Sequence, residues 1–168
     1  STQNAGGTAI TSVVSLKNTS PVIHRLGVRH VMNSGALCDG VTNDSIAIQA
    51  ADTLAIIFGD TVIEFPSGSC FIGTTTINMS RGLTYQGQSM DKDRSEITYS
   101  GTGSGLRYNE SNINSSGYGQ VTIRDLVVRH TTASGGSNTG AGIEINAGGF
   151  SYFQINRVTV TGAFKYGV

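Results

Sequence analysis

The sequence is short of several features that would point to a particular kind of partner. None of its 168 residues is Trp, two are Pro, and only 13% are charged. Eleven basic residues balance eleven acidic ones, so no overall field attracts nucleic acid or an anionic membrane surface. No apolar run reaches the roughly 18 residues that a membrane-spanning helix requires. We therefore expect no nucleic-acid partner and no membrane insertion.

Residues that bind metals are also scarce. The two cysteines, Cys38 and Cys70, lie far apart in the chain, and the three histidines, His24, His30 and His130, are dispersed among them. This spacing matches no metal-ligand motif, so we expect neither a metal nor a cofactor. No secretory leader opens the sequence to indicate an oxidising compartment. We therefore predict two buried free thiols, with a disulfide as the alternative.

What the chain has instead is Gly, Ser, Thr and Asn between short runs of Ile, Val, Leu and Phe, as in all-β proteins with many tight turns. One helix is predicted, over 44–58. Asp44 is expected to accept a backbone N–H of its first turn, and Gly59 to end it. Five apolar residues at helical spacing form its predicted buried stripe: Ala47, Ala50, Ala51, Leu54 and Phe58.

After the helix, two strand types recur in the same order. The matching segments are VTIRDLVV (121–128) with FQINRVTV (153–160), LTYQG (83–87) with the first half of that unit, and GLRYN (105–109) with GIEIN (142–146). Residues 165–168 resemble the start of a third copy of the second unit. Repeats of this kind predict a solenoid, with a β-sandwich as the alternative.

Residues 31–89 resemble the opening of the pectate-lyase-like, right-handed parallel β-helix superfamily. Its members carry a G-A-x-G-D-G-x-x-D-D-T-x-A-I-Q-x-A cap and then a T-V-x-F-P-x-G strand. Here Cys38 replaces a glycine of the cap and Asn43 replaces the first Asp of its pair. The matching residues are Gly35, Ala36, Asp39, Gly40, Asp44, Ala47, Ile48, Gln49 and Ala51 in the cap, and Thr61, Val62, Phe65, Pro66 and Gly68 in the strand.

The resemblance implies an all-β chain, a right-handed parallel β-helix with an N-terminal capping α-helix and an extended N-terminal arm. Residues 1–27 would be the arm, which includes an alternating run from Thr8 to Leu16. Residues 28–60 would be the cap with its helix, and 61–168 the first coils of the β-helix. Because a strand begins at Phe164 and is not completed, we expect the coils to continue beyond Val168.

The resemblance is greatest to bacteriophage tailspikes and capsular polysaccharide depolymerases. It implies a homotrimeric virion protein of the phage tail that acts at the host cell surface. The arm would contact other tail or baseplate proteins, and the β-helix would bind host capsule or lipopolysaccharide. The alternatives are a non-catalytic receptor-binding adhesin of the tail and a secreted β-helix glycanase or lyase.

No catalytic residue can be assigned from the sequence, although hydrolysis of a glycan requires two carboxylates on either side of a bond. The candidates are Asp125, at a bend where a turn carboxylate is expected, and Glu144. On matched strands Glu144 and Arg107 face outward, so we predict a surface ion pair between them. The remaining predicted residues are structural members of the cap: Gly35, Asp39, Gly40, Asp44 and Gln49.

Overall fold

The computed structural model describes residues 27–91, 93–109, 119–132, 139–146 and 151–168. In chain order its elements are β1 (Val28–His30), η1 (Val31–Ser34, a 3₁₀ helix), β2 (Asp39–Asn43), α1 (Ser45–Phe58), β3 (Val62–Phe65), β4 (Gly68–Phe71), β5 (Ile77–Asn78), β6 (Thr84–Gly87), β7 (Ser95–Tyr99), β8 (Leu106–Asn109), β9 (Gly119–His130), β10 (Ile143–Asn146) and β11 (Ser151–Thr161).

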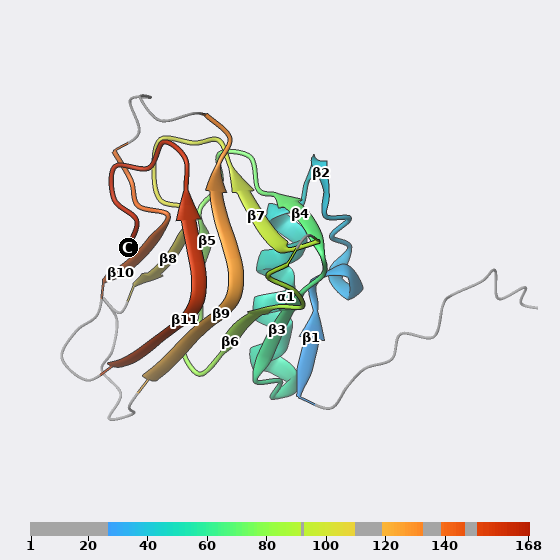
Figure 1. The fold of residues 1–168 in the computed structure, drawn as a ribbon. Helices are drawn as coiled ribbons and strands as arrows, with labels where there is room; N and C mark the ends of the chain where they lie inside the picture. The colour runs from blue at the N-terminus through green and yellow to red at the C-terminus, as the bar shows by residue number, and fades with distance from the viewer. Residues whose placement is uncertain (1–26, 92, 110–118, 133–138, 147–150) are drawn as a thin grey trace, which may run out of the picture.

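The strands pair in parallel throughout the described residues and form two sheets. The larger has the order β1-β3-β6-β9-β7-β4-β2, with β11 beside β9, and the smaller has the order β10-β8-β5 (Figure 1). Strand β9 pairs with β6 through its first half and with β7 through its second, so the larger sheet curls around the core. This mostly parallel β architecture with one α-helix is consistent with a parallel β-helix.

The repeats found in the sequence are strands stacked in register, as predicted. Val121 pairs with Phe153 and Val128 with Val160 where β11 lies beside β9. The second repeat is the pairing of β8 with β10. The backbone N–H of Gly142 donates to the carbonyl oxygen of Tyr166 over 3.1 Å, so the predicted third copy also lies in its expected place. The spacing of apolar residues in the sequence therefore predicted the register correctly.

Strands β9 and β11 each bend at one residue with left-handed backbone. Asp125 has φ 56° and Arg157 has φ 50°, and the two occupy equivalent positions in the paired strands. On the next strand, Gly87 approaches this bend so closely that a Cβ added to it would lie 1.9 Å from the carbonyl oxygen of Asp125. A side chain at position 87 would therefore prevent β6 from packing against the bend.

Helix α1 begins and ends almost where the sequence predicted. Asp44 is its N-cap residue, and Gly59, with φ 74°, donates its N–H to the carbonyl oxygen of Ala55 at the C-terminus. The predicted stripe is wrong, since Phe58 is exposed and, of the five predicted residues, Ala51 is the fully buried one. The face that is buried consists of Ser45, Ile48, Ala51, Asp52 and Ala55.

Asp44 occupies the predicted N-cap position, but the side-chain bond to the first turn that was predicted for it is wrong. Its carboxylate accepts the backbone N–H groups of Leu37 at 2.7 Å and Cys38 at 3.1 Å, and makes no side-chain bond to the helix. Asn43 accepts the N–H of Ser45 instead, over 3.0 Å. The acid thus holds the preceding turn against the helix start, a long-range task that helix-capping rules do not anticipate.

The prediction of free thiols is corrected as well, because Cys38 and Cys70 form a disulfide. Asp39 of β2 pairs with Ser69 of β4, which places the two cysteines side by side although 32 positions separate them in sequence. The segment 39–43 of the predicted cap forms strand β2. Cys38 has φ 51°, a left-handed conformation that favours glycine and explains why the family pattern has glycine there.

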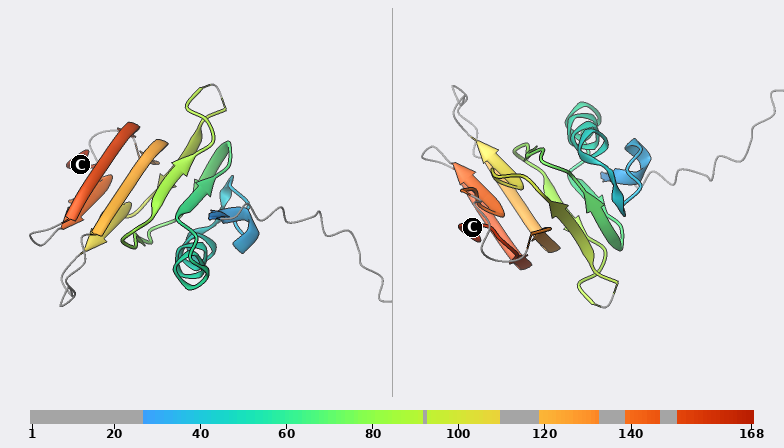
Figure 2. Two further views of the ribbon diagram at one scale, coloured as in Figure 1. Left: turned by 90° about the horizontal axis from the view of Figure 1, so that it is seen from below. Right: turned by 90° about the horizontal axis from the view of Figure 1, so that it is seen from above.

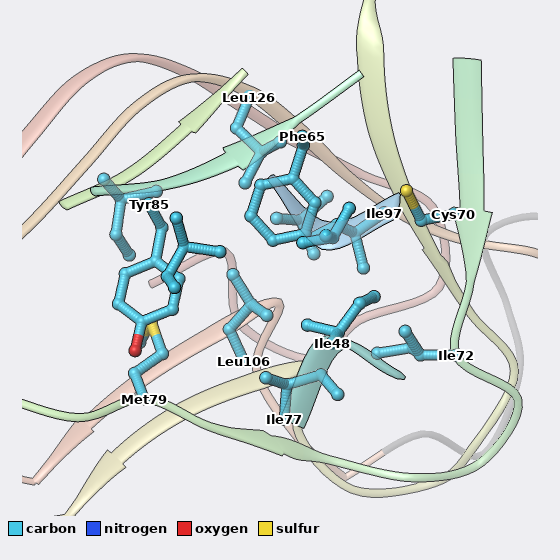
Figure 3. Close-up of a cluster of buried hydrophobic side chains, with 14 of the residues drawn as sticks. Ile48, Phe65, Cys70, Ile72, Ile77, Met79, Tyr85, Ile97, Leu106 and Leu126 are labelled. Carbon is cyan, nitrogen blue, oxygen red and sulfur yellow. The ribbon is translucent and has the colours of Figure 1, made fainter. Parts of the chain in front are cut away.

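The core lies between the two sheets and α1. Figure 3 shows Leu126 and Phe65 directed inward from the larger sheet, Leu106 and Ile77 from the smaller one, and Ile48 from the helix. All five are fully buried. Figure 2 shows α1 beside the β1–β3 side of the molecule, away from β10 and β11.

The predicted arm, with its alternating run 8–16, lies outside the described residues, and the limits proposed for the three regions remain predictions. No helix within the described part of the chain is long and apolar enough to cross a membrane.

Candidate functional site

Polar side chains of α1 bond to the edge of the smaller sheet. The Gln49 amide donates to the Asn78 carbonyl oxygen and accepts the Asn78 N–H, both over 3.0 Å, so it satisfies both backbone groups of that residue of β5. Asp52, which is buried, accepts the Ser80 hydroxyl at 2.6 Å and the Tyr85 hydroxyl. Burial, with the Asp52 charge adding to it, raises the pKa of Tyr85 far above its usual value, so the phenol remains a donor.

The other residues of the family pattern shape the turn before α1. Asp39 accepts the backbone N–H groups of Val41 and Thr42 at 2.9 and 2.7 Å, and these bonds lower the pKa of its carboxyl. Gly35 and Gly40 have φ values of 100° and 81°, which residues other than glycine rarely adopt. These contacts are internal to the turn, so they give the segment shape and offer no reacting group.

Cys38, Cys70 and Asp44 bring one possible ligand atom each to within 4.8 Å of one another. The two sulfurs are bonded to each other, so neither is a thiolate, the form of cysteine that binds metals. The Asp44 carboxylate is already occupied by two backbone N–H groups. The arrangement is therefore a structural staple beside a helix start.

The outer face of the smaller sheet carries the predicted ion pair. Arg107 lies beside Glu144 on adjacent strands, and its Nε donates to Glu144 Oε2 over 2.8 Å. The Ser104 hydroxyl donates to the same oxygen over 2.6 Å. We define the Arg107–Glu144 row as Asn78, Arg107 and Glu144, which occupy one register position across β5, β8 and β10.

The charges of this row are accessible to solvent, because the Arg107 and Glu144 side chains are 37% and 38% exposed. The hydrogen bonds from Ser104 and Arg107 lower the pKa of the Glu144 carboxyl. Glu144 is therefore ionised at neutral pH and cannot act as a general acid there. It can accept hydrogen bonds from hydroxyl groups, while Arg107 and the neighbouring amides of Asn109 and Asn146 can donate to them.

Asp125, the other catalytic candidate, lies on the opposite side of the core. Its carboxylate pairs with the guanidinium of Arg157 at the equivalent bend of β11. Its neighbour Leu126 and Arg107's neighbour Leu106 point into the core from opposite sheets (Figure 3). The structure therefore does not bring Asp125 and Glu144 together around one bond, as hydrolysis by two carboxylates would require.

Glu96 is a third carboxylate at an outward sheet position, and it is neutralised in place. The Nε atoms of Arg94 and Arg129 donate to its two oxygens over 3.1 and 2.7 Å. Its side chain is almost wholly buried beneath the two guanidinium groups. A carboxylate held from both sides in this way maintains β7 against β9 and is not free to react.

A second row of polar side chains, which was not predicted from the sequence, crosses five strands of the larger sheet at one register position. We call it the His30 row and list its members at the end of this paragraph. Partial burial lowers the pKa of His30, and the charge of Glu64 partly opposes that effect. Within the row Arg124 Nη2 donates to the Gln86 side-chain oxygen over 2.5 Å, while the Gln88 amide bonds to both His30 and Glu64. Its members, which occupy one register position, are His30, Glu64, Gln86, Arg124 and Asn156.

Of the two rows, the Arg107–Glu144 row is the better candidate for ligand binding. Its two charged side chains are more than a third exposed, so a ligand can reach both of them. Of the described residues on this outer face, Glu144 is the single carboxylate. The face can therefore hold a hydroxyl-rich ligand, and it lacks the second acid that hydrolysis would use.

Neither a known family model nor a curated protein matches the chain. Solved structures that are similar to it include the following two. One is the A-module of the mannuronan C-5 epimerase AlgE6 from Azotobacter vinelandii, at 20% identity and a TM-score of 0.58 over 82% of this chain. The other is ORF18 of Geobacillus virus E2, at 19% identity and a TM-score of 0.55 over 77% of this chain. The matched parts span 39% and 25% of those two chains. These likenesses support the parallel β-helix fold for this chain.

Proposed function

We propose that this chain is part of a bacteriophage tail protein and binds a polysaccharide of the host surface through the outer face of its smaller sheet. The observation that carries the proposal is the Arg107–Glu144 row, an accessible acid and base set among amide side chains on a rigid sheet. Similarity in fold to a phage protein and to an enzyme named for its action on mannuronan supports the same reading.

The chemistry of the row suits a glycan. Sugar hydroxyls both donate and accept hydrogen bonds, and the row presents both kinds of partner. An ionised Glu144 accepts, Arg107 donates, and Asn78 does both. Strands of one sheet lie about 4.8 Å apart, so such groups recur at short, regular intervals along the stack, as hydroxyls do along a polysaccharide.

We further propose that the whole protein is a homotrimeric tailspike located in the virion. Residues 1–27 would connect this part to other tail or baseplate proteins, and α1 would cap the first coil of the β-helix. The hydrogen bonds of Gln49 with Asn78 of β5, and of the Ser80 hydroxyl just after β5 to Asp52, support the capping role.

A depolymerase is the second candidate function, favoured by the likeness to an epimerase that acts on a polysaccharide. Because Glu144 has no second carboxylate beside it among the described residues of its face, the cleaving groups would lie elsewhere in the protein. Incubating the full-length protein with capsule and weighing the products by mass spectrometry separates the readings. Unchanged chain length supports an adhesin, and shortened products support a depolymerase.

Binding itself is tested by titrating the protein with a panel of purified capsules and lipopolysaccharides in a calorimeter. Arg107→Ala should weaken binding about tenfold or more, because it removes a charged donor and leaves Glu144 without its partner. Arg124→Ala is the matched control, since Arg124 is also outward-facing but belongs to the His30 row. Equal loss of affinity in both variants, or in neither, would contradict the proposal.

A further inference from the structure

Helix α1 has an outer face that no described residue covers. Ile46 is 84% exposed and Ile57 is 67% exposed, and they lie on the same side of the helix because eleven residues make about three turns. The single charged residue of α1, Asp52, is buried. A helix that is apolar on all sides is normally covered on all sides.

A groove of 760 Å³ runs beside this face, between α1 and the segment that leads into β5. None of the residues that line it is charged. Helix residues Ile46, Ala50 and Leu54 form one wall, and Thr75 and Thr76 lie on the other. An anionic glycan or a nucleic acid would find no charged partner in this groove. An uncharged, apolar peptide segment needs no such partner and can pack against the apolar wall.

A second copy of the chain, docked helix to helix, would use this face poorly. The fourteen residues of α1 form a rod about 21 Å long and about 10 Å wide, which offers roughly 200 Å² to a partner. A stable interface between proteins buries about 800 Å² on each partner. The occupant is therefore better sought in a segment that is already tethered nearby.

The chain supplies such a segment. Residues 1–16 contain no Asp, Glu, Lys or Arg, and the run 8–16 includes Ile10, Val13, Val14 and Leu16. This segment reaches the described structure at Gly27, whose carbonyl oxygen accepts the Thr61 N–H over 2.9 Å, two residues after Gly59 ends α1. The intervening residues 17–27 can extend about 36 Å, more than the length of the helix.

We propose that residues 8–16 dock along the outer face of α1 in the same chain and fill the groove beside β5. Tethering raises the local concentration of the segment, so a modest apolar contact is enough to hold it. Docking covers Ile46 and Ile57 and fixes where the connector leaves the strands. Residues 1–7 remain available to reach other proteins.

Site-specific photocrosslinking in the full chain tests this contact. A benzophenone amino acid at position 57 should crosslink to residues 8–16 within a species of monomer mass. The same probe at Thr159, an exposed position on β11 at the far end of the stack, is the control and should give no crosslink to residues 8–16. Placing a charge in the segment, with Val13→Asp and Val14→Asp together, should lower the yield from position 57 about tenfold.

Three results would overturn the proposal. They are crosslinks from position 57 that join two chains, crosslinks that miss residues 8–16, and equal yields from positions 57 and 159. Circular dichroism checks that each variant is folded, so that the crosslinking yields can be compared. Because residue 57 is exposed and the proposed contact of residues 13 and 14 is with the outer face of α1, the folded signal should not change.

Discussion

The two ends of the stacked strands are built from similar sequence units but differ in what covers them. At the α1 end, side chains of the helix take the place of a neighbouring strand, as Gln49 does for Asn78. At the β11 end, Ile155 lies in register with Ile123, yet it is 40% exposed where Ile123 is 1% exposed. The burial of a side chain in this fold therefore depends on the strand stacked beyond it as much as on the residue itself.

The largest effect should come from the disulfide at the α1 end. Replacing both Cys38 and Cys70 by Ala frees a loop of 32 residues, so chain entropy predicts a loss of about 4 kcal/mol in the free energy of unfolding. Urea denaturation followed by circular dichroism measures it. Replacing Cys38 by Gly in the Cys70→Ala background should restore about 1 kcal/mol, because residue 38 has φ 51°. No difference between Ala and Gly at 38 would argue against backbone strain there.

A second pair of substitutions tests the comparison directly. Ile123→Ala should cost about 3 kcal/mol of unfolding free energy, because it opens a cavity in the closed part of the core. Ile155→Ala, at the registered position on β11, should cost about 1 kcal/mol, because that side chain is already partly solvated. Both values come from denaturant midpoints at equal slope. Equal costs would mean that the β11 end is as well covered in solution as the middle of the stack.

Gln49 and Gln154 provide a third matched pair. Gln49→Ala leaves the N–H and carbonyl groups of Asn78 without their partner, and we expect a loss of about 1–2 kcal/mol. Gln154→Ala changes an exposed residue of β11 and should be within about 0.5 kcal/mol of the parent. The midpoints of thermal unfolding show which of the two substitutions costs more stability. A silent Gln49→Ala would show that the helix does not stabilise the edge of the smaller sheet through this amide.

The smallest effect is the pH dependence that Glu144 contributes. Its pKa is lowered in the folded state, so its contribution to stability is present above its usual pKa of 4.5 and is lost as the pH falls through the lowered value. Because the pair is well exposed, the contribution should be below about 1 kcal/mol. Denaturation at pH 7 and pH 3 should show a larger difference between parent and Glu144→Gln at pH 7 than at pH 3. A larger difference at pH 3 than at pH 7 would contradict the lowered pKa of the Glu144 carboxyl in the folded state.

The sequence predicted the repeating parts of this molecule well. Alignment of residues 121–128 with 153–160 gave the register of β9 against β11, because inward side chains recur at the same place in each repeat. The ion pair of Arg107 with Glu144 followed from the same alignment. Contacts that depend on how β2 folds were predicted poorly. The prediction of free thiols was wrong because the disulfide joins Cys38 to Cys70, 32 positions away. The side-chain bond from Asp44 to the helix was wrong because its carboxylate accepts the N–H groups of the preceding residues 37 and 38 instead.

The buried face of α1 shows why counting apolar residues was not enough. Asp52 faces the core because Ser80 and Tyr85 supply its hydrogen bonds, and a helical count of apolar positions excludes it. The usable signal was that Asp52 is the one charged residue of the predicted helix after its first residue, Asp44. The His30 row was missed for a related reason, since its members come from five separate strands and share no local motif.

Binding of polysaccharide to the outer face of the smaller sheet can be measured by hydrogen exchange, with and without a bound capsule or lipopolysaccharide fragment. We expect added protection of backbone amides in β8 and β10, at residues 104–109 and 141–146, with no change in β3 and β6. Protection confined to β3, β6 and the first half of β9 would place the ligand on the His30 row and contradict the account.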